Sequence, residues 1–374
     1  MSDDDRSVLA RPVDAAEDQP PITARAVTAG ITPRRSRLDQ ADLKRWLGTV
    51  VFVVAAVYIL FGASAFNQYQ ASLVLVFAVA ALGQDWLMGR AGQISLGAAA
   101  FMAGGAFITA RISTESWAPF PLPIIISAVF GCVLGLIVGL TGLRFRGLYL
   151  ALSTLALQFI VAFAAERYQG KNEAGFVAAV PHLGGFKFAT VQRLNLMFLI
   201  VLALVLLGLG GIYRRAPGRA WAAIRQDEVA AAVAGVDVVK WKLLAFVGSS
   251  GVIAVAGSLY AYQASTVTYI PFSISLAVSI LVMVFIGGLG SMTGAIIGAV
   301  IVELLPDWLQ SITNGLGGSS GLSAWLQTNH AELALAIYGL ALLLVLIFER
   351  DGIVGLLNRL FNLVIRLAGR KERA

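Results

Sequence analysis

Long apolar segments, separated by short polar ones, follow each other along most of the chain. Many of them approach the roughly 20 residues that an α-helix needs to cross the hydrocarbon core of a bilayer. We therefore predict an all-α, polytopic membrane protein with about ten transmembrane helices, some of them broken at glycines. The predicted spans are 46–66, 71–88, 92–110, 121–141, 147–165, 194–213, 243–263, 274–290, 292–305 and 331–348.

Two of these spans, 92–110 and 292–305, differ from the others because glycine, alanine and serine replace many of the bulky apolar residues. Short or glycine-interrupted spans are typical of discontinuous helices that line a transport path. Regularly spaced small residues are equally typical of helices that pack closely in a membrane. The pattern does not separate these two interpretations, which are compatible with each other.

Composition agrees with a membrane protein, since 58% of the residues are hydrophobic, 13% are charged and the mean hydropathy is +0.80. Soluble proteins average about 45–50% apolar and about 25% charged residues. The single cysteine, Cys132, excludes an internal disulfide, and we expect it to be a small buried hydrophobe. The two histidines lie in polar linkers, and no Gly-x-x-x-x-Gly-Lys-Ser/Thr phosphate loop occurs. We therefore predict no metal or cofactor bound by this chain.

The two ends of the chain differ from its apolar middle. Residues 1–44 are rich in charges and prolines and lack apolar periodicity, which indicates a disordered tail. Residues 349–374 place apolar side chains at helical spacing and arginines on another face, which predicts an amphipathic helix on the membrane surface. The predicted membrane domain is therefore 45–348.

The distribution of basic residues predicts an orientation. Cytoplasmic segments of membrane proteins carry an excess of Lys and Arg. With a cytoplasmic N-terminus, most of the 28 lysines and arginines fall on the cytoplasmic side, and both termini lie there. The basic residues left on the outer side are Arg111, Arg167, Lys171, Lys187 and Arg193.

The longest loop on the predicted cytoplasmic side, residues 214–242, has the pattern of two short helices. Alanines dominate it, Asp227 and Glu228 form an acidic pair, and Gly235 is placed to end the second helix. Small side chains would let such a helix enter a cleft of a soluble partner and pass that partner's motion to the flanking spans. The alternative is a solvated loop that is kept positive for topology.

The same loop resembles the coupling loop of permease subunits of ATP-binding cassette (ABC) importers. The whole chain is similar to the branched-chain amino acid permease family, on its LivM-like side. Val229 occupies the position where the general importer motif has glutamate, and Glu228 comes one residue earlier. The residues proposed for ATPase coupling on this resemblance are Gly218, Arg219, Arg225, Asp227, Glu228, Ala230, Ala231 and Gly235.

Further segments resemble the family in the same order along the chain: 89–101, 144–157, 285–299 and 344–355. Their glycines and neutral polar side chains suit a path that binds its solute weakly. The alternative for any one of these residues is helix packing, with hydroxyl groups bonded to their own helix backbone. The candidate path residues are Gln93, Ser95, Gly97, Gly147, Tyr149, Thr154, Gly288, Gly290 and Ser291.

The resemblance implies a role and a set of partners. The chain would be a non-enzymatic permease subunit of a bacterial cytoplasmic membrane, moving branched-chain or other small amino acids. It would work with a second homologous, LivH-like permease, two LivG/LivF-like ATPase subunits and an extracytoplasmic solute-binding protein. ATP and magnesium would bind to the ATPases, which would dock at 218–235. The binding protein would dock near 166–193 and 306–330.

Some membrane-embedded residues depart from the family pattern. The family often has histidine where this chain has Ala98, Leu-Asn where it has Gln84 and Asp85, and glutamate near Gln158. Relatives in the family also move urea and other small polar or aromatic solutes. A permease for such a solute is therefore the alternative within the family.

Two carboxylates inside predicted spans support a rival from another class, an ion-driven secondary transporter. A carboxylate at mid-bilayer costs about 2.5–3.5 kcal/mol, so Asp85 and Glu303 could be coupling groups. Because Asp85 is close in sequence to Arg90, pairing between them near the cytoplasmic end is the interpretation we favour. A secondary transporter does not need the loop 214–242, and a scaffold without transport would not explain the glycine-broken spans.

Overall fold

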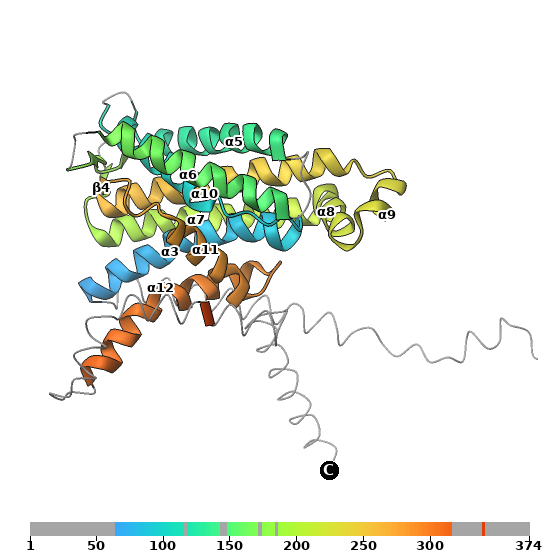
Figure 1. Ribbon diagram of the computed structural model, residues 1–374. Helices are drawn as coiled ribbons and strands as arrows, with labels where there is room; N and C mark the ends of the chain where they lie inside the picture. The colour runs from blue at the N-terminus through green and yellow to red at the C-terminus, as the bar shows by residue number, and fades with distance from the viewer. Residues whose placement is uncertain are drawn as a thin grey trace, which may run out of the picture. The chain divides into compact units, whose positions relative to one another are not determined.

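The computed structural model describes residues 64–115, 118–142, 148–170, 174–183, 186–315 and 339–340 (Figure 1). The predicted tails 1–44 and 349–374, most of the spans 46–66 and 331–348, and Gly147 lie outside these residues.

The described part is predominantly helical, as the apolar pattern predicted, and its helices account for the eight spans from 71–88 to 292–305. Helices long and apolar enough to cross a membrane cover Phe66–Arg90, Leu122–Leu140, Tyr149–Gln169, Val191–Arg214 and Val238–Ala264. The helices are α3 (Ala65–Asp85), continued by the π-helical turn η2 (Trp86–Arg90), α4 (Ala98–Ser113), α5 (Leu122–Gly142), α6 (Leu148–Gln169), α7 (Val191–Arg214), α8 (Ala216–Gln226), α9 (Glu228–Val233), α10 (Val238–Ala264), α11 (Ile274–Gly287) and α12 (Met292–Gly315).

Helices α3 and α10 form the centre of the bundle. α10 packs against α3, α4 and α5, and α3 also packs against α7, α11 and α12. Small residues make these contacts close: a Cβ on Gly257 of α10 would lie 1.9 Å from the carbonyl oxygen of Met102 in α4. A Cβ on Gly105 would likewise lie 2.0 Å from the oxygen of Ala254. The glycines of span 92–110 therefore serve close helix packing.

The span 92–110 also contains a real break. Residues 91–97 are not helical, Gly92 has φ +68°, and α4 begins at Ala98. A second break separates α11 from α12, where Gly288 and Gly290 have φ values of +109° and +85°. The glycine-rich spans thus combine close packing inside the helices with interruption at their ends.

Besides its helices, the described part of the chain contains four very short strands. Two-residue strands pair at the end of the bundle away from α8 and α9: β1 (Phe176–Val177) with β4 (Thr266–Val267), and β2 (His182–Leu183) with β3 (Phe186–Lys187) (Figure 1). Strands this short have no detectable alternation, and β1 and β4 are brought together only by the packing of helices between them.

Candidate functional site

The predicted coupling loop folds as the two helices α8 and α9 at one end of the bundle (Figure 1). Pro217 lies in the first turn of α8, where its missing N–H costs no hydrogen bond. A Cβ on Gly218 would lie 2.0 Å from the carbonyl oxygen of Tyr213, so glycine permits the sharp turn from α7 into α8.

An aromatic cluster fixes α8 to the bundle. The Trp221 side chain is fully buried, and its indole N–H donates to the carbonyl oxygen of Trp241 at 2.8 Å. Its ring centroid lies 5.5 Å from that of Trp86, 6.2 Å from Trp241 and 6.4 Å from Tyr213, all in edge-to-face geometry. The cluster joins α8 to η2, α7 and α10, so a displacement of α8 acts on three elements.

Helix α9 has well-formed ends. The Asp227 carboxylate accepts hydrogen bonds from the backbone N–H groups of Val229 (2.8 Å) and Ala230 (3.0 Å), which makes Asp227 the N-cap. At the other end the Val236 N–H donates to Ala231 and the Gly235 N–H to Ala232, with Gly235 at φ +83°. This is a Schellman motif, and it confirms Gly235 as the predicted helix stop.

The exposed face of α9 is apolar and made of small or medium side chains. Val229 is 70% exposed and Val233 is 85% exposed, with Ala230 and Ala232 exposed beside them. Ala231 is buried on the opposite face. A partner that approaches α9 would therefore meet the valines and Ala230, and Ala231 belongs to the packing of α9 on the bundle.

Glu228 is engaged within the chain. Its carboxylate pairs with the Lys242 ammonium at the start of α10, and Lys242 is mostly buried. The carbonyl oxygen of Lys242 accepts a hydrogen bond from the Gln93 amide at 3.1 Å. The acidic pair of the loop thus caps α9 through Asp227 and ties α9 to α10 through Glu228.

Arg225 points from α8 toward the bundle. Its guanidinium donates to the carbonyl oxygen of Gly89 in η2, and its aliphatic stem lies against Gly92. Arg219 and Arg225 are both exposed residues. Of the two arginines predicted for coupling, Arg225 is the one that bonds η2 of the bundle.

Asp85 has a different hydrogen-bond partner from the one we favoured. The carboxylate, which is buried, accepts a hydrogen bond from the Gly290 N–H at 2.6 Å. Arg90 instead places its guanidinium carbon 4.7 Å from the ring centroid of Tyr213. The pairing with Arg90 fails because the turn between α11 and α12, distant in sequence, supplies a backbone donor beside Asp85.

Four predicted path residues gather at the break 91–97. The Leu96 N–H donates to the Thr154 hydroxyl at 2.9 Å, and the Gly97 N–H donates to the Ser95 hydroxyl at 3.3 Å. Thr154 also donates to the oxygen of Ala151 in its own helix. Gln93, Ser95, Gly97 and Thr154 therefore hold the non-helical segment in place, and of their two hydroxyls it is that of Thr154 which takes the helix-backbone-bonded form given as the alternative.

The remaining path residues separate into two places. Gly288, Gly290 and Ser291 form the turn between α11 and α12, where the Ser291 hydroxyl accepts from the Gly294 N–H at 3.1 Å. Gly290 contacts Gly89, so this turn joins the 86–97 segment. Tyr149, on α6, is 67% exposed.

The family model for a branched-chain amino acid transport system permease component matches residues 68–346. The chain belongs to this family. Two relatives are named high-affinity branched-chain amino acid transport system permease protein LivM. The one from Salmonella typhimurium is 29% identical over 316 residues, covering 75% of this chain and 73% of the relative. The one from Escherichia coli K12 is 28% identical over 312 residues, with the same coverage. No solved structure matches the chain.

The family match confirms the resemblance found in the sequence, and it makes the chain a membrane transport permease component rather than an enzyme. The match spans both chain breaks and both helices of the coupling loop.

Sequence reasoning missed the aromatic anchor of this permease. None of its four residues was a candidate, although Trp86, Tyr213 and Trp241 stand at junctions of an apolar span and a polar segment, and Trp221 lies inside the loop 214–242. Aromatic residues at such junctions are common as interface anchors. Their grouping around α8 depends on how α3, α7 and α10 pack, which the sequence pattern does not contain.

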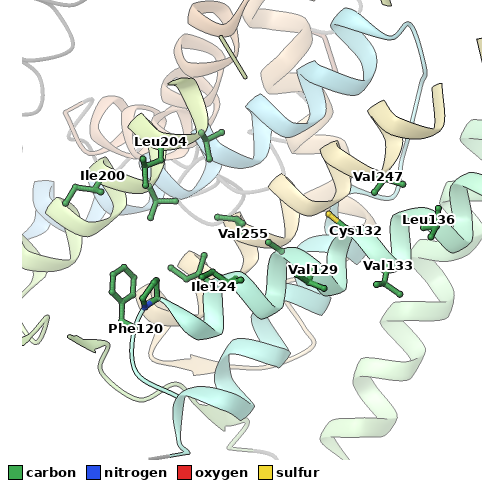
Figure 2. Close-up of a pocket in the computed structure, with 15 residues that line it drawn as sticks. Phe120, Ile124, Val129, Cys132, Val133, Leu136, Ile200, Leu204, Val247 and Val255 are labelled. Atoms are coloured by element: carbon green, nitrogen blue, oxygen red, sulfur yellow. The ribbon is translucent and has the colours of Figure 1, made fainter. Parts of the chain in front are cut away.

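The permease also has an apolar groove of about 780 Å³ between α5, α7 and α10 (Figure 2). Ile124, Val129, Leu204 and Val247 line it, and Cys132 lies in it partly buried rather than in the core. The groove offers no charged or hydrogen-bonding side chain, so it does not match the polar path that the sequence predicted.

Proposed function

We propose that this permease is the membrane-spanning subunit of an ATP-driven importer for branched-chain or other small amino acids. The LivM relatives support the substrate class through their names, and the α8–α9 pair supports the energy source. An ion-driven carrier would have no use for a rigidly anchored helical pair with an exposed apolar face.

The observation that carries the proposal is the surface of α9. Val229, Ala230 and Val233 present small and medium apolar side chains on a helix whose two ends are both capped. Such a face can enter a cleft of an ATPase subunit, and Arg219 and the exposed Asp227 can set its register. Residues 218–235 are the proposed docking segment, and within it Arg225 is bonded to Gly89 of the bundle rather than offered to the ATPase.

The other proposed partners follow from the family. A second homologous, LivH-like permease completes the membrane unit, two LivG/LivF-like ATPases bind ATP and magnesium, and an extracytoplasmic binding protein delivers the solute. The end that carries α8 and α9 would face the cytoplasm of a bacterium, as would both termini. The binding protein would dock near 166–193 and 306–330; the first of these segments carries β1, β2 and β3, at the end of the bundle opposite α8 and α9.

The proposed path is weakly polar. The binding protein captures the solute, so the membrane unit has to let the solute pass and does not have to bind it tightly. The breaks at 91–97 and 288–291 supply flexible backbone at the proposed cytoplasmic end. The departures at Ala98, Gln84 and Gln158 leave urea or another small polar or aromatic solute as the alternative cargo.

Reconstitution tests the proposal. The complete transporter, in vesicles with its binding protein, should take up radiolabelled leucine only when ATP reaches the ATPases. Uptake should continue when proton and sodium gradients are collapsed, because ATP hydrolysis is the proposed energy source. Uptake that follows an ion gradient without ATP would contradict it, and competition by urea but not by isoleucine would replace the proposed substrate.

A further inference from the structure

The end of η2, just before the first break, contacts the turn that forms the second break. Gly89 lies in η2, and Gly290 lies in the turn between α11 and α12. A Cβ on Gly89 would lie 2.3 Å from the nitrogen of Gly290 and 2.7 Å from its Cα. The two backbones therefore approach each other closely, with the Asp85 carboxylate beside them, since its Oδ1 would lie 2.1 Å from the same Cβ. We call this contact of Gly89 and Gly290 the glycine joint.

Two side chains from different elements hold the glycine joint. Asp85 of α3 accepts a hydrogen bond from the Gly290 N–H at 2.6 Å. Arg225 of α8 donates to the carbonyl oxygen of Gly89, and one of its terminal nitrogens would lie 2.9 Å from a Cβ on Gly290. The joint thus connects α8, the end of α3 and the start of α12 through two polar contacts.

The hydrogen bonding around the joint is incomplete. The second carboxylate oxygen of Asp85 and the Nε of Arg90 are buried, and neither has a hydrogen-bond partner among the described residues. Buried polar groups without partners are costly, so they favour a rearrangement that pairs them. Arg90 and Arg225 both lie within electrostatic reach of Asp85. A small displacement would let the carboxylate exchange the Gly290 N–H for a guanidinium.

The backbone on one side of the joint can follow such an exchange. Gly288 and Gly290 have positive φ values of +109° and +85°, and no side chain restricts either residue. Immediately beyond the turn, Gly287 and Gly294 bring α11 and α12 together, since a Cβ on Gly287 would lie 2.0 Å from the oxygen of Gly294. The turn is thus a flexible link between two closely packed helices.

We propose that Asp85 and Arg225 form a coupling switch, in which movement of α8 acts through Arg225 on Gly89 and breaks the hydrogen bond between Asp85 and Gly290. Both are positioning residues, and the element they release is the turn between α11 and α12. This inference rests on the proposed function, because an ATPase docked on α9 is what moves α8. It gives the movement a direct route to α3 and α12, besides the flanking helices α7 and α10.

Variants of the complete transporter in vesicles test the switch. Asp85→Asn keeps an oxygen for the Gly290 N–H but removes the charge that attracts a guanidinium, and Arg225→Ala removes the link to α8. In each, we expect leucine uptake per ATP hydrolysed to fall about tenfold while the ATPases still copurify. Matched controls are Glu115→Gln and Arg111→Ala, which break an exposed ion pair on α4 and should match wild type.

The double variant shows whether Asp85 and Arg225 act in the same switch or affect transport independently. If both residues act in one switch, Asp85→Asn with Arg225→Ala should lose about tenfold, as each single change does, rather than about a hundredfold. A multiplicative loss would overturn the switch. So would loss of ATPase copurification in Arg225→Ala, because Arg225 would then be a docking residue.

A measurement on the unaltered transporter does not depend on how the variants fold. Hydrogen–deuterium exchange of residues 286–293 should be faster when a non-hydrolysable ATP analogue is bound, because the Gly290 N–H loses its acceptor. Unchanged exchange together with ATP-dependent uptake would overturn the switch and leave the proposed function intact. Absence of ATP-dependent uptake in wild type would overturn the proposed function, and the switch with it.

Discussion

Individual glycines show how differently one residue type is used in this permease. Gly257 and Gly105 lie where α4 and α10 touch, and a Cβ at either would lie within about 2 Å of a backbone oxygen. Gly208 in α7 has nothing within 4 Å of the position of a Cβ. Gly235 and Gly290 are needed instead for their positive φ. Counting glycines along the chain does not distinguish these uses.

A pair of alanine substitutions tests this distinction. Gly257→Ala should destabilise the protein by about 1–3 kcal/mol, because a methyl group there overpacks the contact with Met102. Gly208→Ala is the matched control and should be neutral or stabilising by up to about 1 kcal/mol, since alanine favours the helix. Thermal unfolding in detergent measures both. Equal melting temperatures for the two variants would show that α4 and α10 can move apart to admit a methyl group with little loss of stability.

Among the helices, the pair α8–α9 has one face for the bundle and one for a partner. Trp221, Ile224 and Ala231 are buried, whereas Val229 and Val233 are exposed. Glu228 and Asp227 are occupied by Lys242 and by the N-terminal N–H groups of α9. The acidic pair therefore keeps α9 in place, and the apolar face is the larger part of the proposed docking surface.

A charge on that face should weaken docking. Val233→Asp places a carboxylate in the proposed apolar contact, and we expect ATPase binding to fall about tenfold or more, since desolvating the charge is unfavourable. Val177→Asp, at a similarly exposed valine of β1, should leave ATPase binding unchanged. Copurification of the ATPases at increasing salt measures both. Full binding by Val233→Asp would remove α9 from the docking surface.

For the molecule as a whole, the orientation in the membrane is a prediction from its basic residues. The segment between α6 and α7 and the segment between α9 and α10 lie at opposite ends of the bundle (Figure 1). A reporter inserted at residue 180 should therefore be extracytoplasmic, and one at residue 236 should be cytoplasmic. A phosphatase and fluorescent-protein pair reads both positions. A cytoplasmic signal at 180 would overturn the predicted topology.

The eight predicted spans that fall on described residues correspond to α3 to α7 and α10 to α12. They were predictable because a helix in a membrane requires a long run of apolar residues. The helical character of 214–242 and the end of α9 at Gly235 could likewise be predicted from the sequence, since helix capping depends on neighbours within one turn. The partner of Asp85 was not readable in this way, because Gly290 lies 205 residues away.

The local pattern thus determined that this is a membrane protein, where its helices lie and which loop is the predicted coupling loop, because each of these depends on short stretches of chain. Folding decided what those stretches meet. The contact of Gly89 with Gly290, the aromatic anchor of α8 and the inward direction of Arg225 each join elements far apart in sequence. Such contacts exist only once α3, α8, α10 and α12 are packed together, because packing alone brings their residues within bonding distance.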